Sequence, residues 1–250
     1  MRHWLAVLVA LVLVAPASSA ADSYSTNCTP AQDPWRDTAG GGNWLVGRAD
    51  GIDWLDITTV PGYCSLTAGN PNSYNDTTGV VGGLWGPVQA VSAVVFYSRG
   101  NADNDGHGFA QETELRLLTT ISPHFITGYE VQCGQIVRWN GVIGDFTVLP
   151  TLGGDGIGPQ SGDILSADVD ASGVISMYRN GTLCQRAQDT VIRSGAPGLG
   201  LFTRNPKPPL FGFTSFSASD NGTLPPLPSP SPPRRRSPFT VVLRIRDDVS

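Results

Sequence analysis

The hydrophobic positions of this chain recur in short β-branched and aromatic runs, and helical periodicity is almost absent after the first residues. Gly, Asn, Asp and Pro bound these runs, which is typical of strands joined by tight turns. Many strands at close spacing, with no helices between them, predict an all-β sandwich or jelly roll. The predicted strands are 90–98, 113–121, 126–133, 136–141, 146–152, 163–169, 174–181 and 212–219.

Two turns are specified by their residues. "DASG" at 170–173 predicts a hairpin connection in which Asp170 accepts a hydrogen bond and Gly173 takes positive φ. "RNGT" at 179–182 is an Asn-Gly turn of the type that matches strand twist. Asp168, Asp170 and Ser172 also mimic a calcium loop, but Arg179 stands where a closing carboxylate belongs, so the turn interpretation is favoured.

A different hydrophobic pattern opens the chain. Arg2 precedes an apolar run at 4–15, then Pro16 and the small residues "ASSAA", which is the layout of a secretory signal peptide. The run is shorter than the roughly 20 residues that span a bilayer, so an uncleaved membrane anchor is the less favoured alternative. We therefore predict a signal peptide at 1–21 and an exported protein, secreted or held at the cell surface or in the periplasm, with no membrane span after cleavage.

The rest of the chain divides into one domain at 22–220 and a tail at 221–250. The tail is rich in Pro, Ser and Arg, which predicts an extended, disordered segment without a core. A formal net charge of −5 and the lack of a basic stripe in the domain argue against a nucleic-acid partner. We expect a monomer.

The four cysteines are Cys28, Cys64, Cys133 and Cys184. None forms a CxxC pair, and an even number in an exported chain favours disulfides over a zinc cluster. Three pairings are possible. We favour Cys28–Cys64 and Cys133–Cys184, because the first two lie in irregular N-terminal sequence and the other two in strand-like sequence.

Several motifs along the chain resemble those of a known superfamily. They are Gly162-Asp163, Ile175, Asn180-Gly181, Asp189 and 194–200, with "GYEV", "WNGVIGDFTVL" and "FGFTSFSASD" fitting other strands. Over about residues 35–220, the chain resembles the LamG-type jelly rolls of the concanavalin A-like lectins and glucanases. The resemblance implies two curved antiparallel sheets and a concave face that is often used for carbohydrate, and calcium is common as a structural ion in such domains.

The stretch "NADNDGHGFAQE" has the spacing of a calcium loop. Asn101, Asp103 and Asp105 take positions one, three and five, Gly106 takes position six, and Glu112 takes position twelve. Asn in place of the first Asp and the strand-like flanks weaken the match, and a surface loop uses the same residues. Structural calcium at Asn101, Asp103, Asp105 and Glu112 is one hypothesis, and a plain loop is the other.

The following "ETELRLL" places Glu112, Glu114 and Arg116 on one face of a strand and Leu115 and Leu117 on the other. Two carboxyls at this spacing can reach the separation that a retaining glycosidase needs. Laminarinase-like relatives use Glu-x-Asp-x-(x)-Glu, and this chain lacks both the Asp and the third carboxylate. We also expect the nearby Arg to lower the pKa of an adjacent Glu, which does not suit a general acid.

The same segment resembles the "R-[TS]-E-[LV]-R" motif of alginate lyases, a second enzyme class with a jelly-roll fold. Glu112 stands where the first Arg belongs, and "QIV" at 135–137 lacks the family's His. A polysaccharide lyase is therefore the runner-up hypothesis, ahead of a glycoside hydrolase, with His107 or His124 as possible substitutes.

Strand alternation suggests a sugar-binding face instead of an active site. If Tyr129, Val131 and Cys133 point into the core, then Glu130 and Gln132 share an open face with Glu114 and Arg116. The favoured function is a non-catalytic carbohydrate-binding or cell-surface interaction module, and the tryptophans are predicted to lie in the core. The predicted sugar-binding residues are Glu114, Arg116, Glu130, Gln132 and Tyr178.

Overall fold

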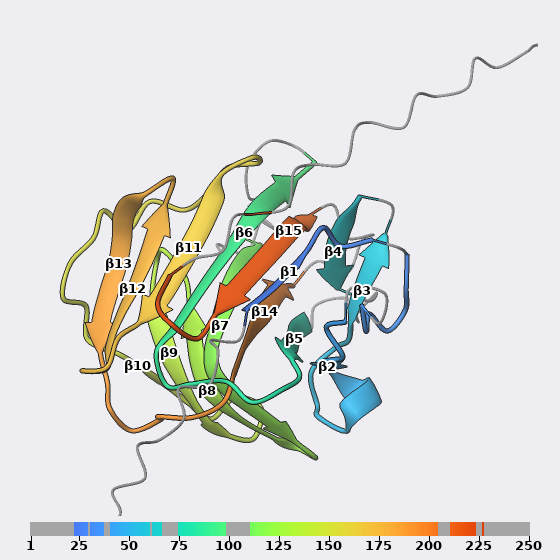
Figure 1. The fold of residues 1–250 in the computed structure, drawn as a ribbon, viewed down its shortest axis with the longest axis horizontal. Coiled ribbons are helices and arrows are strands. Elements are labelled where there is room, and N and C mark those ends of the chain that lie inside the picture. Colours follow the sequence, from blue (N-terminus) through green and yellow to red (C-terminus); the bar gives the residue numbers. More distant parts are fainter. Residues whose placement is uncertain are drawn as a thin grey trace, which may run out of the picture.

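The computed structural model describes residues 23–29, 31–37, 41–60, 62–66, 75–98, 111–204, 211–223 and 227. They form a sandwich of two antiparallel sheets (Figure 1). The predicted fold class and the two-sheet architecture that the resemblance implied are therefore confirmed. The predicted signal peptide, the loop residues Asn101, Asp103 and Asp105, and nearly all of the predicted tail lie outside the described residues.

Each sheet is named here after one central strand. The β6 sheet contains β1 (Ser23–Thr26), β3 (Ile57–Val60), β4 (Tyr63–Leu66), β6 (Gln89–Tyr97), β11 (Ile164–Val169), β12 (Val174–Arg179), β13 (Thr182–Gln188) and β15 (Phe211–Ser219). The β7 sheet contains β2 (Trp44–Val46), β5 (Asn75–Val81), β7 (Glu112–Ser122), β8 (Phe125–Val131), β9 (Ile136–Gly141), β10 (Phe146–Val148) and β14 (Ala196–Thr203).

The order of the described strands is β13-β12-β11-β6-β15-β4-β3 in the first sheet, with β1 paired to β15, and β10-β9-β8-β7-β14-β5-β2 in the second. The main hydrophobic core lies between the sheets. It includes Leu115, Leu117, Tyr129 and Val131, so the inward face predicted for β7 and β8 is confirmed. The alternate residues of these strands point to the outer face of the β7 sheet.

All eight predicted strands are present, although the predicted strand 146–152 ends at Val148, before Pro150. The prediction missed β1 to β5, β13 and β14. The reason is clearest in β14, because Pro197, Gly198 and Gly200 resemble strand breakers in the sequence. The first four missed strands are only three or four residues long, so their alternation is too brief to detect.

Both predicted turns are confirmed. Asp170 Oδ1 accepts hydrogen bonds from the backbone N–H groups of Ser172 and Val174, and Gly173 has a φ of 80°. Asn180 and Gly181 both adopt positive φ, as a twisted two-residue hairpin requires.

Both favoured disulfides are present. Cys28 is bonded to Cys64 across 36 residues of sequence, and Cys133 to Cys184 across 51 residues. The second bond ties the turn after β8 to β13, and thus joins one sheet to the other.

A strap formed by residues 47–55, between β2 and β3, covers part of the outer face of the β7 sheet. Its two ends hydrogen-bond to β5, through Gly47 N–H to Thr78 O and Leu55 N–H to Asp76 O. Its apolar residues Ile52 and Trp54 reach β8 and β9, where they form a second buried cluster with Ile126, Val137 and Trp139. The predicted open face is therefore partly closed.

The prediction that the tryptophans belong to the core is also supported. Trp35, Trp44, Trp54 and Trp139 are buried, and Trp85 packs against the main core. In the part of the chain that the structure describes, no helix is long and apolar enough to span a membrane.

Replacing Trp54 with Ala tests whether the strap is a packed part of the fold. Trp54 is fully buried and contacts Trp139 with ring centroids 5.2 Å apart. We expect the free energy of unfolding to fall by about 3–5 kcal/mol, measured by urea denaturation. Leu84→Ala is the matched control, since Leu84 is 91% exposed and its truncation should change stability by less than about 0.5 kcal/mol. Equal effects of the two substitutions would contradict the assignment of the strap to the core.

Candidate functional site

The strand register brings the predicted polar residues together on the outer face of the β7 sheet. Arg116 of β7 is directly opposite Glu130 of β8. On the other side of β7, Gly200 of β14 is opposite Glu114, and Phe202 is opposite both Glu112 of β7 and Asp76 of β5. We call Asp76, Glu112, Glu114 and Glu130, which surround Arg116, the acidic cluster.

Arg116 holds the centre of this cluster. Its Nη1 donates to Glu130 Oε2 at 2.9 Å, and its Nη2 donates to Glu114 Oε2 at 2.6 Å. Nη2 also lies 3.6 Å from Asp76 Oδ1. The guanidinium carbon is 5.9 Å from the ring centroid of Trp139, a cation–π contact that adds to these charge-assisted hydrogen bonds.

Two further side chains complete the network. The Trp139 indole N–H donates to Glu130 Oε2 at 2.8 Å. Gln132 Nε2 donates to Glu112 Oε2 at 2.9 Å and to Glu130 Oε1 at 2.7 Å. Gln132 and Glu112 are half-buried, whereas the residues below them are closed off from solvent, so the cluster meets solvent at the Glu112–Gln132 end.

The predicted sugar-binding face is therefore wrong in two respects. Glu114, Arg116 and Glu130 are only 1%, 0% and 5% exposed, because they satisfy one another and lie beside the residues that the strap covers. Tyr178 lies on β12 in the β6 sheet, opposite Ser166 of β11, so it does not join the other four residues.

The expectation that Arg116 lowers the pKa of an adjacent glutamate is also wrong in its net direction. Burial raises the pKa of Glu112 to about 7, helped by the charge of Glu130 and only partly opposed by Gln132 and Arg116. Burial, followed by the charge of Glu130, holds the pKa of Glu114 well above its usual range. Burial likewise raises the pKa of Asp76 to about 8, although the attraction of Arg116 opposes it. Loss of solvation outweighs the single cation.

Gly200 is the part of the site that the sequence did not indicate. A Cβ at this position would lie 2.2 Å from Glu114 Oε2 and 2.7 Å from Arg116 Nε. The two charged side chains thus lie directly over the bare backbone of β14. A glycine within a strand that faces a predicted charged pair is the signal that could have located it.

Only some of the residues that the lyase and hydrolase hypotheses require are available in this cluster. Both Nη atoms of Arg116 donate hydrogen bonds to carboxylates of the cluster, so Arg116 is not available to bind the carboxylate of a uronate. His124 is exposed and contacts Asp53 of the strap, and His107 lies outside the described residues. What remains is a half-buried Glu112 with a pKa near neutrality.

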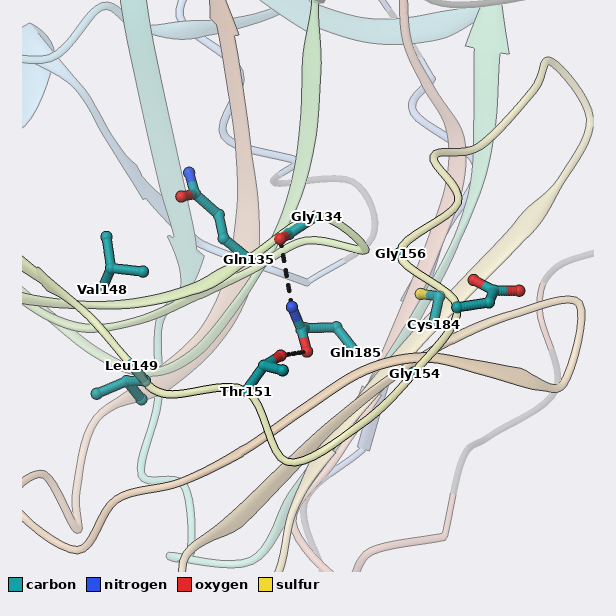
Figure 2. A pocket seen from close by; sticks show the side chains of 10 residues that line it. Gly134, Gln135, Val148, Leu149, Thr151, Gly154, Gly156, Cys184 and Gln185 are labelled. Atoms are coloured by element: carbon teal, nitrogen blue, oxygen red, sulfur yellow. Dashed lines mark hydrogen bonds between the residues drawn. The ribbon is translucent and has the colours of Figure 1, made fainter.

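A separate pocket lies beside the turn that follows β8 (Figure 2). In the view of Figure 2, Gln185 spans it, because its Nε2 donates to Gly134 O and its Oε1 accepts from the Thr151 hydroxyl. The pocket, which we call the side pocket, has a volume of about 450 Å³ and is lined by Gly134, Gln135, Val148, Leu149, Thr151, Gly154, Asp155, Gly156, Cys184 and Gln185.

The edge strand β10 extends the apolar wall of the side pocket. Phe146 and Val148 are 47% and 54% exposed, and being two residues apart they share one face of the strand. The Phe146 ring packs against Trp139 with centroids 5.3 Å apart. One buried tryptophan thus contacts both the acidic cluster and the exposed edge.

No family model and no curated protein matches this sequence. Among solved structures, the carbohydrate-binding module CBM66 from Bacillus subtilis is 10% identical, with 71% of this chain and 92% of that chain covered and a TM-score of 0.41. The β-porphyranase BpGH16B from Bacteroides plebeius is 8% identical, with 82% of this chain and 93% of that chain covered and a TM-score of 0.43. The potassium-bound carbohydrate recognition domain of Emp46p is 11% identical, with 79% of this chain and 96% of that chain covered and a TM-score of 0.44.

The raised pKa values predict that the stability of the protein depends on pH. Asp76 and Glu112 bind protons more tightly in the folded chain than in the unfolded chain, so the folded state is favoured at low pH and loses this advantage as the pH rises through about 7 to 8. We expect the free energy of unfolding, measured by urea denaturation in a chelating buffer, to fall by a few kcal/mol between about pH 5 and pH 8.5. The size follows because a pKa that differs by one between the folded and unfolded chains is worth about 1.4 kcal/mol.

Glu112→Gln provides the control for this pH effect, because it removes one titrating group and should make the fall in stability shallower between about pH 5 and pH 7, while the fall up to about pH 8 that Asp76 causes remains. A stability that rises over the same interval would contradict the raised pKa values.

Proposed function

We propose that the protein is an exported, non-catalytic carbohydrate-binding or cell-surface interaction module that contacts sugar at the side pocket and along β10. The observation that carries the proposal is the lining of the side pocket, where amide, hydroxyl and backbone groups converge beside aliphatic side chains. Sugar sites combine the same elements, since hydroxyls need directed polar partners and ring C–H groups need an apolar surface.

Gln135 is the side chain best suited to bind a sugar. Its amide has no hydrogen-bond partner among the described residues and is half-buried at the rim. An amide offers both a donor and an acceptor, which suits neighbouring hydroxyls. By contrast, Gln185 and Thr151 bond each other and hold the shape of the pocket.

Phe146 supplies the apolar partner. One side of its ring packs on Trp139, so the ring is held in place while the side chain stays almost half exposed. An immobilised aromatic ring gives contact area at little entropic cost. Val148 lies on the same face of β10 and lines the side pocket, so the apolar surface of β10 is continuous with the pocket.

The charges of the pocket favour a neutral ligand. None of its lining residues is cationic, and Asp155, the one carboxylate among them, is paired with Arg179 at 3.6 Å. The lining therefore presents no cation to an acidic polysaccharide, and Arg116 is buried away from solvent. We therefore propose a neutral polysaccharide as the ligand, and the two disulfides support an oxidising, extracellular setting.

Binding is tested by affinity electrophoresis on a panel of neutral glucans, galactans and arabinans, with alginate and pectate as acidic probes. We expect retardation by at least one neutral polymer and none by the acidic ones. Phe146→Ala and Gln135→Ala should each weaken binding about tenfold, equivalent to about 1.4 kcal/mol. Val191→Ala serves as the control, since Val191 is 69% exposed and does not line the pocket. Binding that neither substitution weakens would contradict the proposed surface.

The second candidate is a divergent polysaccharide-degrading enzyme, a lyase before a hydrolase. The observation that favours it is Glu112, whose pKa of about 7 at the solvent end of the cluster suits proton transfer. We expect no product in assays for new reducing ends or for absorbance near 235 nm. If product forms, and is lost with Glu112→Gln but not with Phe146→Ala, the enzyme hypothesis replaces the proposal of a non-catalytic binding module.

A further inference from the structure

The acidic cluster contains more negative groups than its cation can balance. Four carboxylates surround one guanidinium, and neither Gln132 nor Trp139 carries charge. Ionised carboxylates in a buried site need a cation or a proton for each charge, because the loss of hydration is otherwise not compensated. The network on the outer face of the sheet therefore lacks positive charge to balance its carboxylates.

Two buried carboxylate oxygens of the cluster lack a hydrogen-bond partner among the described residues. Glu114 is 1% exposed, and its Oε1 has no hydrogen-bond partner among the described residues. Asp76 Oδ1 is also buried and accepts no hydrogen bond there, although Arg116 Nη2 lies 3.6 Å away. Native proteins rarely leave such atoms unsatisfied, so an unsatisfied buried carboxylate oxygen points to a ligand.

The carboxylates are close enough to share one ion. Glu112, Glu114 and Glu130 each offer an oxygen, and these three oxygens lie within 4.8 Å of one another. Oxygens that bind Ca²⁺ stand about 2.3–2.6 Å from the ion, so two ligands on opposite sides of it are about 5 Å apart. The spacing fits that shell without movement of the strands.

We propose that Glu112, Glu114 and Glu130 bind one hard divalent cation, for which Ca²⁺ is the best match. All three ligands are carboxylates, which favours Ca²⁺, Mg²⁺ or Mn²⁺ over softer metals. Mg²⁺ fits less well, because it gives up its waters reluctantly and two of the three ligands are buried. The site is separate from the side pocket, so it does not depend on the proposed carbohydrate binding.

Gln132 is placed to act as a fourth ligand. Its Nε2 lies between Glu112 and Glu130 and donates a hydrogen bond to each carboxylate, at the position that a cation would otherwise occupy. A half-turn of the amide exchanges its nitrogen for Oε1 and directs an acceptor at the ion. The Glu112–Gln132 end, where the cluster meets solvent, is the entry path.

This site differs from the calcium loop that the sequence suggested. Glu112 belongs to both, but Glu114 and Glu130 replace Asn101, Asp103 and Asp105 as ligands. The difference allows a direct test, because the loop residues and the cluster residues can be substituted separately.

The experiment measures the melting temperature of the full chain after chelation, with and without 1 mM CaCl₂ (about a hundred-fold over a Kd of 10 μM), and Tb³⁺ luminescence excited through tryptophan. We expect a Ca²⁺-dependent rise in melting temperature and a saturable Tb³⁺ signal that Ca²⁺ displaces, since Trp139 bonds the ligand Glu130. Glu114→Gln and Glu130→Gln should weaken Ca²⁺ binding at least tenfold, and the double substitution Asp103→Ala with Asp105→Ala should leave it unchanged.

If Glu114→Gln and Glu130→Gln do not fold, Glu112→Gln decides the matter, because Glu112 is only half-buried. A thermal shift lost in Glu112→Gln but kept in the loop double variant supports the cluster site. The proposal is overturned if Ca²⁺ changes neither readout, which would mean that protons alone neutralise the cluster. It is equally overturned if the loop double variant abolishes the shift, whether or not Glu112→Gln retains it, because Glu112 would be a ligand of the loop site as well.

Discussion

The insertion of Arg116 between Glu114 and Glu130 is the interaction on which the rest of the outer face depends. A buried guanidinium is tolerated only where carboxylates pair with it and hydrogen-bond its donors. The sequence around it meets this requirement: Gly200 leaves room for the two side chains, and Trp139 both donates to Glu130 and lies against the guanidinium. The strap then covers Trp139 with Trp54.

The same interaction connects the interior of the sheet to the side pocket. The turn after β8 starts at Gln132, which bonds the cluster, and continues through Cys133, which is bonded to Cys184. Gly134, the next residue, accepts a hydrogen bond from Gln185. A turn held at three successive residues is a rigid rim, and rigidity reduces the entropy lost when a ligand binds. The buried charge network thus helps to hold the turn that forms one side of the proposed sugar-binding surface.

Much of the fold was predictable, and the site was predictable only in composition. Runs such as those of β6 and β7 have clear boundaries, and the residues Asp170–Gly173 determine the turn between β11 and β12. Alternation also placed Glu114, Arg116, Glu130 and Gln132 on one face. It could not show that the strap closes that face, because Ile52 and Trp54 reach it through long-range packing. Alternation likewise does not say which sheet a strand joins, which is why Tyr178 was grouped with residues of the other sheet.

The central claim is best tested by a double-mutant cycle on Arg116 and Glu130. The free energies of unfolding of Arg116→Met, Glu130→Gln and the double variant are compared with that of the native chain. Each single change leaves a buried charge or donor without its partner, so each should cost about 3–5 kcal/mol. The double change should cost clearly less than the two single costs added, by about 1.5 kcal/mol or more. Additive costs would contradict the claim that this pair organises the outer face.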